Sequence, residues 1–590
     1  MRVGISALNV VESFRVAWRL RWPLLVAHLV VRLFVLAIIT PLVSLLLSLA
    51  IATRGQSALT DQDIAYFLLT PAGLVTALIV LCLLMVSAVL DVALMTSILR
   101  AGQRTAFAVL GHSLRFVMSH LFSLLEFGLR LIIRILLIAA PFLMVAGVVA
   151  MYSFTQYDIN YYLTYRPPGF VMAAAAIAII ALTLVTVLIR QLSGWAVALH
   201  LVLFEGQPSR SAFADSKQRL SGHKAQLVTT IIIWVLARVM LGLAVAAIAG
   251  VSFNLIPNVF GINLQVIATS TIVILLVWAL ANAIITALSN GALADLLFRL
   301  YLRVSPNASR AMATEWGTDK ELSRTSIPLG AFIAAAAAAV VGGIIAGGTL
   351  LEGISSTRTV EIIAHRGAAG SRPENTMAAI NKAVDEGADW VEIDVQETAD
   401  DEVVVAHDSD FMKLAGVDLK IWDASLADLA EIDIGSWFDP SYSGERTPTL
   451  RQALRSVKGR SKVMIELKYY GHDVDLESRV ADIVEELGMA GDISVMSLKY
   501  DGVRKMQSLR PDWRYGVLAA TAIGDLASLE ADFLAVNTGQ ASLQLIKRAH
   551  QRGKKLYVWT VDDPLTMSRM ISMGVDGLIT NEPALARQVM

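Results

Sequence analysis

The chain has 590 residues, of which 55% are hydrophobic and 17% are charged, and its formal net charge is -1. This length predicts more than one domain, and the composition is too apolar for an ordinary soluble protein. A near-neutral charge argues against a nucleic-acid-binding protein. The single cysteine, Cys82, excludes a disulfide framework and a cysteine-based zinc site.

Apolar residues are concentrated before about residue 351. A membrane-spanning helix needs about 20 mostly apolar residues. The sequence predicts seven such helices, and we expect residues 1–354 to form an all-α integral membrane domain. The seventh is the least hydropathic because it is rich in Ala and Gly, although it contains no charge. The predicted spans are residues 24–51, 68–98, 127–151, 170–192, 227–252, 266–289 and 328–350.

The distribution of Lys and Arg predicts the orientation, because these residues concentrate in cytoplasmic loops. The N-terminus and residues 100–122, 206–225 and 290–327 are basic. By contrast, residues 52–65 and 152–169 contain one arginine each, and residues 253–265 contain none. With seven spans, all basic segments are cytoplasmic. The part after residue 350 is then on the periplasmic or extracellular side of a multi-pass cell inner membrane protein, whereas an even number of spans would place it inside.

Several ionisable residues lie within or near the predicted spans, where charge is costly and often functional. Two interpretations are open. The residues could line a polar cavity that receives an anionic lipid headgroup, or they could snorkel to the interfaces and pair inside the bundle. They are His28, Arg32, Asp91, Arg130, Arg134, Arg190 and Arg238.

The C-terminal part, residues 355–590, alternates short apolar runs with helical patterns. This rhythm predicts parallel βαβ units, and its length suits a (β/α)8 TIM barrel. We identify nine runs where a barrel needs eight, so one pair, around Asp394 and His407, is expected to be a hairpin or an extension. An open doubly wound sheet would also fit, but there is no Gly-rich dinucleotide fingerprint.

Acidic residues recur inside these apolar runs. Glu392 and Asp394 are two residues apart on a predicted strand, so they share one face. Glu466 and Lys468 have the same relation on another strand. Such groups are seldom buried unpaired, and carboxylates on one face suit a hard cation such as Ca²⁺ or Mg²⁺.

Two histidines, His365 and His407, each follow a strand and could supply a general acid and a general base. Arg366 could bind a phosphate in bidentate fashion. With the acidic residues, this predicts a metal-dependent phosphoester site at the mouth of the barrel. Two roles are open for Glu374, metal binding and orientation of Arg366, and Asn375 with Thr376 could cap the following helix. Trp559 could either stack on the substrate or pack in the core.

Together these residues resemble the glycerophosphodiester phosphodiesterase family. A segment at about 409–450 resembles the small insertion that follows the second histidine in that family, and the first 350 residues resemble the membrane domain of some bacterial members. The motifs that carry the resemblance are His365-Arg366-Gly367, Pro373-Glu374-Asn375-Thr376, Glu392-x-Asp394, His407-Asp408, Glu466-Leu467-Lys468, Trp559-Thr560-Val561 and Thr580-Asn581-Glu582-Pro583.

The resemblance implies an enzyme that cleaves glycerophosphodiesters to glycerol 3-phosphate and an alcohol. It implies that His365 and His407 are the acid–base pair and that Arg366 and Lys468 neutralise the phosphate. One divalent cation would be held by Glu392, Asp394 and Glu466. We expect a glycerophosphodiester or lysophospholipid-like substrate, either free or lipid-linked, at the surface of the lipid bilayer. The alternative is a lipid or solute transporter or receptor with the barrel as an accessory domain.

Overall fold

In a computed structural model of the protein, the described residues are 9–101, 106–260, 264–305 and 359–590. The chain divides into two compact units. Unit 1 comprises Met1–Val43, Ala77–Ala146 and Ala178–Gly353, and unit 2 comprises Ser44–Thr76, Gly147–Ile177 and Ile354–Met590. Unit 2 therefore contains two segments that precede the C-terminal part by hundreds of residues.

The described residues of the N-terminal part form helices, as predicted, and one short strand, β1 (Ala58–Thr60). Six stretches of the described residues are long and apolar enough to cross a membrane, and they correspond to the first six predicted spans. The predicted seventh span, residues 328–350, lies outside the described residues. The six stretches are Arg21–Ala52, Pro71–Arg100, Leu121–Phe154, Pro168–Glu205, Lys224–Phe253 and Ser270–Val304.

Helices dominate this part because long runs of apolar residues leave the backbone to satisfy its own hydrogen bonds. A π-helical turn over Val35–Ile39 joins two of them. The α-helices are α1 (Val10–Arg19), α2 (Arg21–Phe34), α3 (Thr40–Ala52), α4 (Asp61–Leu68), α5 (Pro71–Ala101), α6 (Ala106–Ser119), α7 (Leu121–Phe154), α8 (Ile159–Tyr165), α9 (Pro168–Gly194), α10 (Ala198–Glu205), α11 (Ser209–Arg219), α12 (Lys224–Phe260) and α13 (Leu264–Val304).

Most of the ionisable residues noted in the predicted spans have polar or aromatic partners inside unit 1. Asp91 lies 3.7 Å from His28 Nδ1 and accepts a hydrogen bond of 3.1 Å from Asn290. His28 Nε2 accepts a 3.3 Å bond from Arg32. Such pairing lowers the cost of charge in an apolar surrounding. Further contacts join Arg130 to Glu126, Arg134 to the Phe213 ring and Arg238 to the Trp234 ring.

The sheet of unit 2 closes into a barrel, because its strand order β2-β13-β12-β11-β9-β8-β7-β3-β4 is joined by a further β2–β3 pairing. Of the nine strands, β4 pairs antiparallel with β3, and the other eight form the parallel barrel. This confirms the predicted TIM barrel and assigns the surplus run to a β3–β4 hairpin. The strands are β2 (Glu361–Ala364), β3 (Trp390–Glu397), β4 (Val403–Val405), β7 (Lys462–Leu467), β8 (Ile493–Ser497), β9 (Tyr515–Ala519), β11 (Phe533–Asn537), β12 (Lys555–Trp559) and β13 (Gly577–Thr580).

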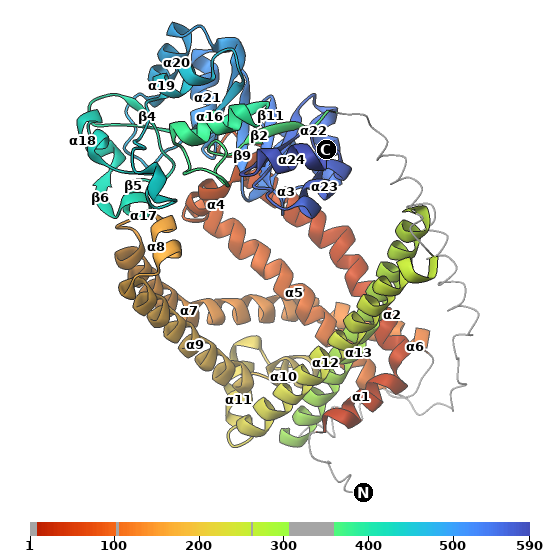
Figure 1. The fold of residues 1–590 in the computed structure, drawn as a ribbon. Coiled ribbons are helices and arrows are strands. Elements are labelled where there is room, and N and C mark those ends of the chain that lie inside the picture. The colour runs from red at the N-terminus through yellow and green to blue at the C-terminus, as the bar shows by residue number, and fades with distance from the viewer. Residues whose placement is uncertain (1–8, 102–105, 261–263, 306–358) are drawn as a thin grey trace, which may run out of the picture. The chain divides into compact units, whose positions relative to one another are not determined.

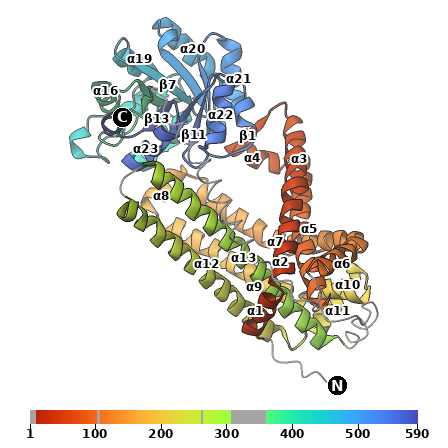
Figure 2. The same cartoon turned by 90° about the vertical axis from the view of Figure 1, so that its right-hand side faces the viewer.

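Barrel strands are buried on both faces, so their side chains alternate between two apolar clusters. Ile362 belongs to the outer cluster beneath the helices, and Ile363 belongs to the inner cluster with Trp390 and Met464. Figures 1 and 2 show the helices around the strands. These helices are α16 (Met377–Asp385), α19 (Leu450–Val457), α20 (Leu476–Glu486), α21 (Tyr500–Leu509), α22 (Leu543–Gln551), α23 (Pro564–Met573) and α24 (Pro583–Val589).

Between β4 and α19 the chain builds a small subdomain around its own apolar cluster, which includes Phe411, Ile421 and Leu429. This is the region in which the sequence predicts an insertion. Its elements are β5 (Asp410–Phe411), α17 (Met412–Ala415), β6 (Val417–Lys420), the 3-10 turns Ile421–Asp423 and Pro440–Tyr442, and α18 (Leu426–Glu431).

The segment Ser44–Thr76 joins unit 2 through backbone hydrogen bonds. Strand β1 pairs antiparallel with β10 (Ala522–Gly524), which follows β9. Next to this ladder the Asp61 carboxylate accepts the N–H groups of Ala520 and Thr521, each at 3.0 Å. The β1–β10 ladder uses main-chain groups on both sides, so its geometry is tightly defined.

We expect Gly367 to be required for the close approach of the turn after β2 to α16. Its φ is +79°, and a Cβ there would lie 2.5 Å from the Ala379 carbonyl carbon. Gly387 has φ +72° but open space around it. Gly387→Ala should therefore cost only the left-handed backbone strain, about 1–2 kcal/mol. Gly367→Ala should lower the free energy of unfolding by a further 1–3 kcal/mol or so, because the core is overpacked. Thermal unfolding in detergent checks this, and equal melting temperatures for the two variants would contradict it.

Candidate active site

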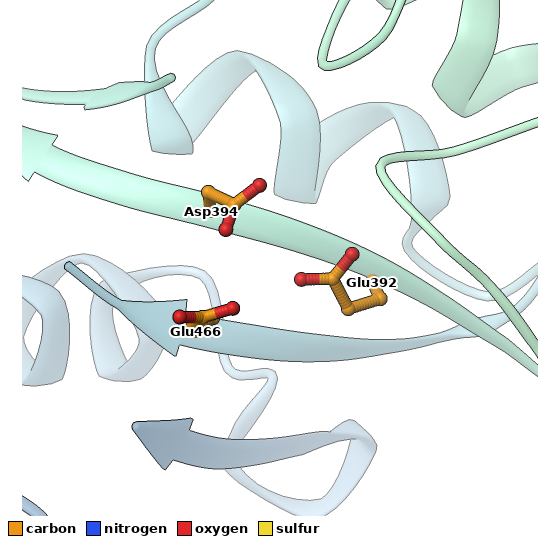
Figure 3. A group of neighbouring side chains, drawn as sticks. All are labelled: Glu392, Asp394 and Glu466. Carbon is orange, nitrogen blue, oxygen red and sulfur yellow. The ribbon is translucent and has the colours of Figure 1, made fainter. Parts of the chain in front are cut away.

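Three carboxylates from two neighbouring barrel strands meet near the carboxyl ends of those strands. Glu392 and Asp394 lie two apart on β3, and Glu466 on β7 is the direct register partner of Asp394. One oxygen of each lies within 4.8 Å of the others, and Figure 3 shows the three side chains gathered beside the two strands. The residues are only 1%, 1% and 6% exposed, respectively. The predicted grouping of these residues is therefore present in the structure.

The electrostatics of this group favour a bound cation. Burial, followed by the charges of Asp394 and Glu466, raises the pKa of Glu392 well above its usual value. Burial also raises the pKa of Glu466 to about 7, against the opposing charge of Lys468. Asp394 Oδ1 is buried and accepts no hydrogen bond from the described residues. An all-oxygen set with an unsatisfied buried oxygen fits a hard cation such as Ca²⁺ or Mg²⁺.

Two cationic side chains border the carboxylates. Lys468 Nζ lies 3.0 Å from Glu466 Oε1 and 3.7 Å from Asp394 Oδ1. The backbone N–H of Arg366 donates to Glu392 at 2.7 Å, and its Nε lies 3.5 Å from Asp394 Oδ2. Arg366 has φ +52°, a left-handed conformation that turns the chain sharply after β2. The site therefore places two fixed positive charges beside the three acids.

Glu374 has both carboxylate oxygens occupied by cations, so the geometry favours orientation of Arg366 over metal binding. Its Oε1 accepts from Arg366 Nη1 at 2.9 Å, and its Oε2 accepts from Lys413 Nζ at 2.8 Å. Although burial alone would raise it, the charges of Arg366 and Lys413 lower the pKa of Glu374 to about 2. Glu374 therefore holds the Arg366 guanidinium in position.

Asn375 holds Asp394 of β3 through two hydrogen bonds. Its side-chain nitrogen donates to Asp394 Oδ2 at 2.8 Å, and its oxygen accepts from the Asp394 N–H at 3.4 Å. Its φ of +56° is one that asparagine tolerates better than most residues. The helix cap is its neighbour Thr376, whose hydroxyl accepts from Ala379 N–H at the start of α16.

Each histidine is held through its Nδ1 atom. His365, which follows β2, lies 2.8 Å from Asn581 Oδ1, and His407, which follows β4, lies 2.6 Å from Asp408 Oδ1. Burial, and then the charge of Arg366, lowers the pKa of His365 to about 4. Burial, and then Lys468, lowers that of His407 well below its usual value. Because an acceptor holds each Nδ1–H, Nε2 is the nitrogen that can exchange a proton.

Trp559 ends β12 and packs against the inner apolar cluster of the barrel. Its indole N–H donates to the carbonyl of Ala535 on β11 at 3.1 Å. These contacts account for its position, and a contact with substrate stays a prediction.

Several polar residues of the site have no role in the sequence-based prediction. Asp408 and Asn581 hold the histidines. Both stand inside recognised motifs, His407-Asp408 and Thr580-Asn581-Glu582-Pro583, and this is the signal by which they could have been found. Lys413, which pairs with Glu374, carries no such signal. Asn160 donates to Asp408 from 248 residues earlier in the chain, a distance that no local pattern reveals.

Comparison with known proteins places this site in a family. The model of the glycerophosphoryl diester phosphodiesterase family matches residues 365–585. The putative glycerophosphodiester phosphodiesterase YhdW of Bacillus subtilis is 31% identical over 229 residues, which cover 38% of this chain and 94% of that protein. The chain belongs to the glycerophosphoryl diester phosphodiesterase family. The resemblance read from the motifs is thereby confirmed, as is the prediction that the protein is a phosphodiesterase of this type.

Two further proteins are similar to this chain over a comparable share of its length. The glycerophosphodiester phosphodiesterase of Caldanaerobacter subterraneus is 30% identical and aligns over 38% of this chain and 94% of its own. A solved phosphodiesterase of Oleispira antarctica, in complex with the product sn-glycerol-3-phosphate, is 25% identical with a TM-score of 0.37. That likeness covers 39% of this chain and 96% of the other.

The ion pairs of Glu374 predict an acid-dependent loss of stability. A carboxyl whose folded pKa of about 2 lies below the ordinary 4.5 stabilises the fold when ionised, and this contribution is lost as pH falls from about 4.5 towards 2. Glu374→Gln should therefore lower the melting temperature in detergent at pH 6, and the difference from wild type should shrink at pH 3.

A matched control is Glu485→Gln, which removes an exposed carboxylate paired with Arg510. It should change the melting temperature little at either pH, because exposed ion pairs contribute little. A constant gap between Glu374→Gln and wild type from pH 6 to pH 3 would refute the assigned ion pairing.

Proposed function

We propose that this protein hydrolyses glycerophosphodiesters to glycerol 3-phosphate and an alcohol with the help of one divalent cation. The observation that carries the proposal is the cluster of Glu392, Asp394 and Glu466, buried together beside Arg366 and Lys468 in a chain of this family. Burying three acids is costly unless cations offset the charge. In a phosphodiesterase the acids would bind the divalent cation, and the two basic side chains would bind the phosphate of the substrate.

The three carboxylates would hold the cation, either Ca²⁺ or Mg²⁺, which supplies positive charge that polarises a phosphoryl oxygen. Lys468 and Arg366 add positive charge at fixed positions, where it stabilises the negative charge that grows on the phosphate oxygens during the reaction. Glu374 and Lys413 keep the arginine in place, and Asn375 keeps Asp394 in place.

His365 and His407 move the protons. The low pKa of each leaves both imidazoles neutral near pH 7, so either can take a proton from the attacking hydroxyl through Nε2. The phosphodiester anion favours the protonated form of the other histidine, which then donates to the leaving alkoxide. The attacking group is either water or a hydroxyl of the glycerol, and both routes use the same two nitrogens.

The barrel acts outside the cytoplasm, at the surface of the cell inner membrane. The supporting observation is that Ser44–Thr76 and Gly147–Ile177, which belong to unit 2 with the barrel, contain residues 52–65 and 152–169, which hold one arginine each and no lysine. Loops of this composition are typically extracytoplasmic. A barrel attached to the membrane on this side suits a substrate that is itself lipid-linked, such as a lysophospholipid.

Metal dependence and catalysis can be separated by substitution. The full-length protein in detergent should release glycerol 3-phosphate from glycerophosphocholine with Ca²⁺ or Mg²⁺, and EDTA should abolish the release. His365→Ala should lower kcat by about 10²–10⁴-fold, the usual contribution of an acid–base catalyst. Its affinity for the metal in calorimetry should be unchanged. Glu392→Gln should reduce both the activity and the metal affinity.

The matched control for the metal is Glu477→Gln, which alters a buried carboxylate of α20 that pairs with Lys505 away from the site. It should retain metal affinity and activity. Release that is insensitive to His365→Ala, or metal binding that survives Glu392→Gln intact, would overturn the proposal. Parallel assays with lysophosphatidylcholine test the lipid-linked substrate.

The orientation is testable by cysteine labelling, because Cys82 is the only native cysteine and can be replaced by serine. Single cysteines at two exposed serines then report the two sides of the membrane: Ser508→Cys in the barrel and Ser221→Cys in a basic loop. In intact spheroplasts, a membrane-impermeant maleimide should label Ser508→Cys and not Ser221→Cys. The reverse pattern would place the barrel in the cytoplasm.

A further inference from the structure

The segment that connects α7 to α9 lies within unit 2, where it contacts the chain just after His407. Its short helix α8 packs against α17 (Figure 1). Asp158 caps α8 by accepting the N–H of Asn160 at 3.0 Å, and it is itself 8% exposed. The other Asp158 oxygen accepts from the Ser409 N–H and the Tyr470 hydroxyl, each at 3.2 Å. The turn before α8 is therefore fixed to the backbone that follows the catalytic histidine.

This anchoring brings Asn160 to the carboxylate that holds His407. Asn160 Nδ2 donates to Asp408 Oδ1 at 2.8 Å, and the same oxygen lies 2.6 Å from His407 Nδ1. Asp408 is only 4% exposed, so water cannot readily replace a lost donor. The three side chains form a continuous series from Asn160 through Asp408 to the imidazole.

A carboxylate can orient a catalytic imidazole only if its own rotamer is fixed. Gln396 fixes the backbone at this point, because its side-chain nitrogen donates to the carbonyls of His407 and Asp408. The Asp408 side chain, by contrast, accepts from Asn160. A donor at 2.8 Å on the shared oxygen sets the torsion of the Asp408 carboxylate and thereby the direction of His407 Nε2.

The helical half of the chain, not the barrel, supplies this donor. YhdW aligns with this chain over 94% of its own length, yet the alignment covers only 38% of this chain. The family model begins at residue 365, far beyond Asn160. A device that depends on Asn160 is therefore an addition to the barrel that these relatives share with this protein.

We propose that Asn160 is a positioning residue of the active site, which acts on His407 through Asp408. The segment that contains α8 thus completes the phosphodiesterase site, and catalysis depends on its seating against the chain after β4. This inference rests on the proposed function, since it assigns Asn160 to the histidine that the proposed reaction uses.

Substitution of Asn160 in the full-length protein tests the inference. Asn160→Ala should lower kcat for glycerophosphocholine by about 10–100-fold, the usual cost of losing an orienting partner, while KM changes little. Asn160→Ser, which keeps a donor, should recover part of the activity. Asn160→Asp keeps the shape of the side chain, removes the donor and sets a second negative charge against Asp408. It should be at least as impaired, and it answers the same question if the alanine variant does not fold.

A double-mutant cycle shows whether Asn160 acts through Asp408. In an Asp408→Ala background, Asn160→Ala should produce no further loss of kcat, because its acceptor is gone. Equal losses in both backgrounds, or an unchanged kcat in Asn160→Ala, would overturn the inference. Tyr165→Phe is the matched control, because it removes another bond that this segment makes, the 2.8 Å bond to the Lys413 carbonyl in α17, and should leave kcat unchanged.

Wild-type protein and His365→Ala are measured in the same series. If wild type releases glycerol 3-phosphate and His365→Ala does not, a neutral Asn160→Ala refutes the positioning role alone. If wild type and His365→Ala are equally inactive, the proposed hydrolysis itself fails. The two ideas therefore fail in distinguishable ways.

Discussion

The main physical constraint on the site is the mutual repulsion of three buried carboxylates, which the surrounding groups must offset. Glu392, Asp394 and Glu466 are removed from water and brought within 4.8 Å of one another, an arrangement that is unfavourable for an isolated set of acids. Lys468 and Arg366 offset two negative charges, so one of the three remains uncompensated when all three acids are ionised. A divalent cation would supply the positive charge that is still missing. The same need explains why so many hydrogen-bond donors surround the three carboxylates.

The barrel makes this arrangement possible through two simple geometric rules. Alternation along β3 puts Glu392 and Asp394 on one face, and the parallel β3–β7 register sets Glu466 opposite Asp394. The left-handed turn at Arg366 then brings its N–H to Glu392, and the left-handed Asn375 reaches Asp394 from the following loop. Two residues in sparsely populated backbone conformations thus tie the β2–α16 connection to β3, which costs strain but fixes the carboxylates.

These rules explain how far the sequence could be interpreted on its own. The carboxylate pairs, the histidines after strands and the barrel follow from local periodicity and motif order, and the structure brings Glu392, Asp394 and Glu466 together as expected. The status of β4 could not be decided from its apolar run, because a short buried strand reads the same whether its pairing is parallel or antiparallel. Asn160 could not be found at all, since nothing in a polar, tyrosine-rich loop specifies a partner 248 residues away.

The two N-terminal segments in unit 2 give the helical half a role beyond attachment. The first segment pairs β1 with β10 and binds the turn between β9 and β10 through Asp61. The second segment buries Asp158 beside Tyr470 and Ser409. Forming a strand pairing or burying a carboxylate costs conformational entropy, because it orders the chain segment involved. A segment that served only as a flexible tether would need neither. The first contact involves the loop after β9, and the second includes Tyr470 after β7, so both reach the carboxyl ends of parallel strands, where TIM barrels build their sites. The segments therefore lie at the end of the barrel where the candidate site is built, and the proposed role of Asn160 would link one of them to His407 through Asp408.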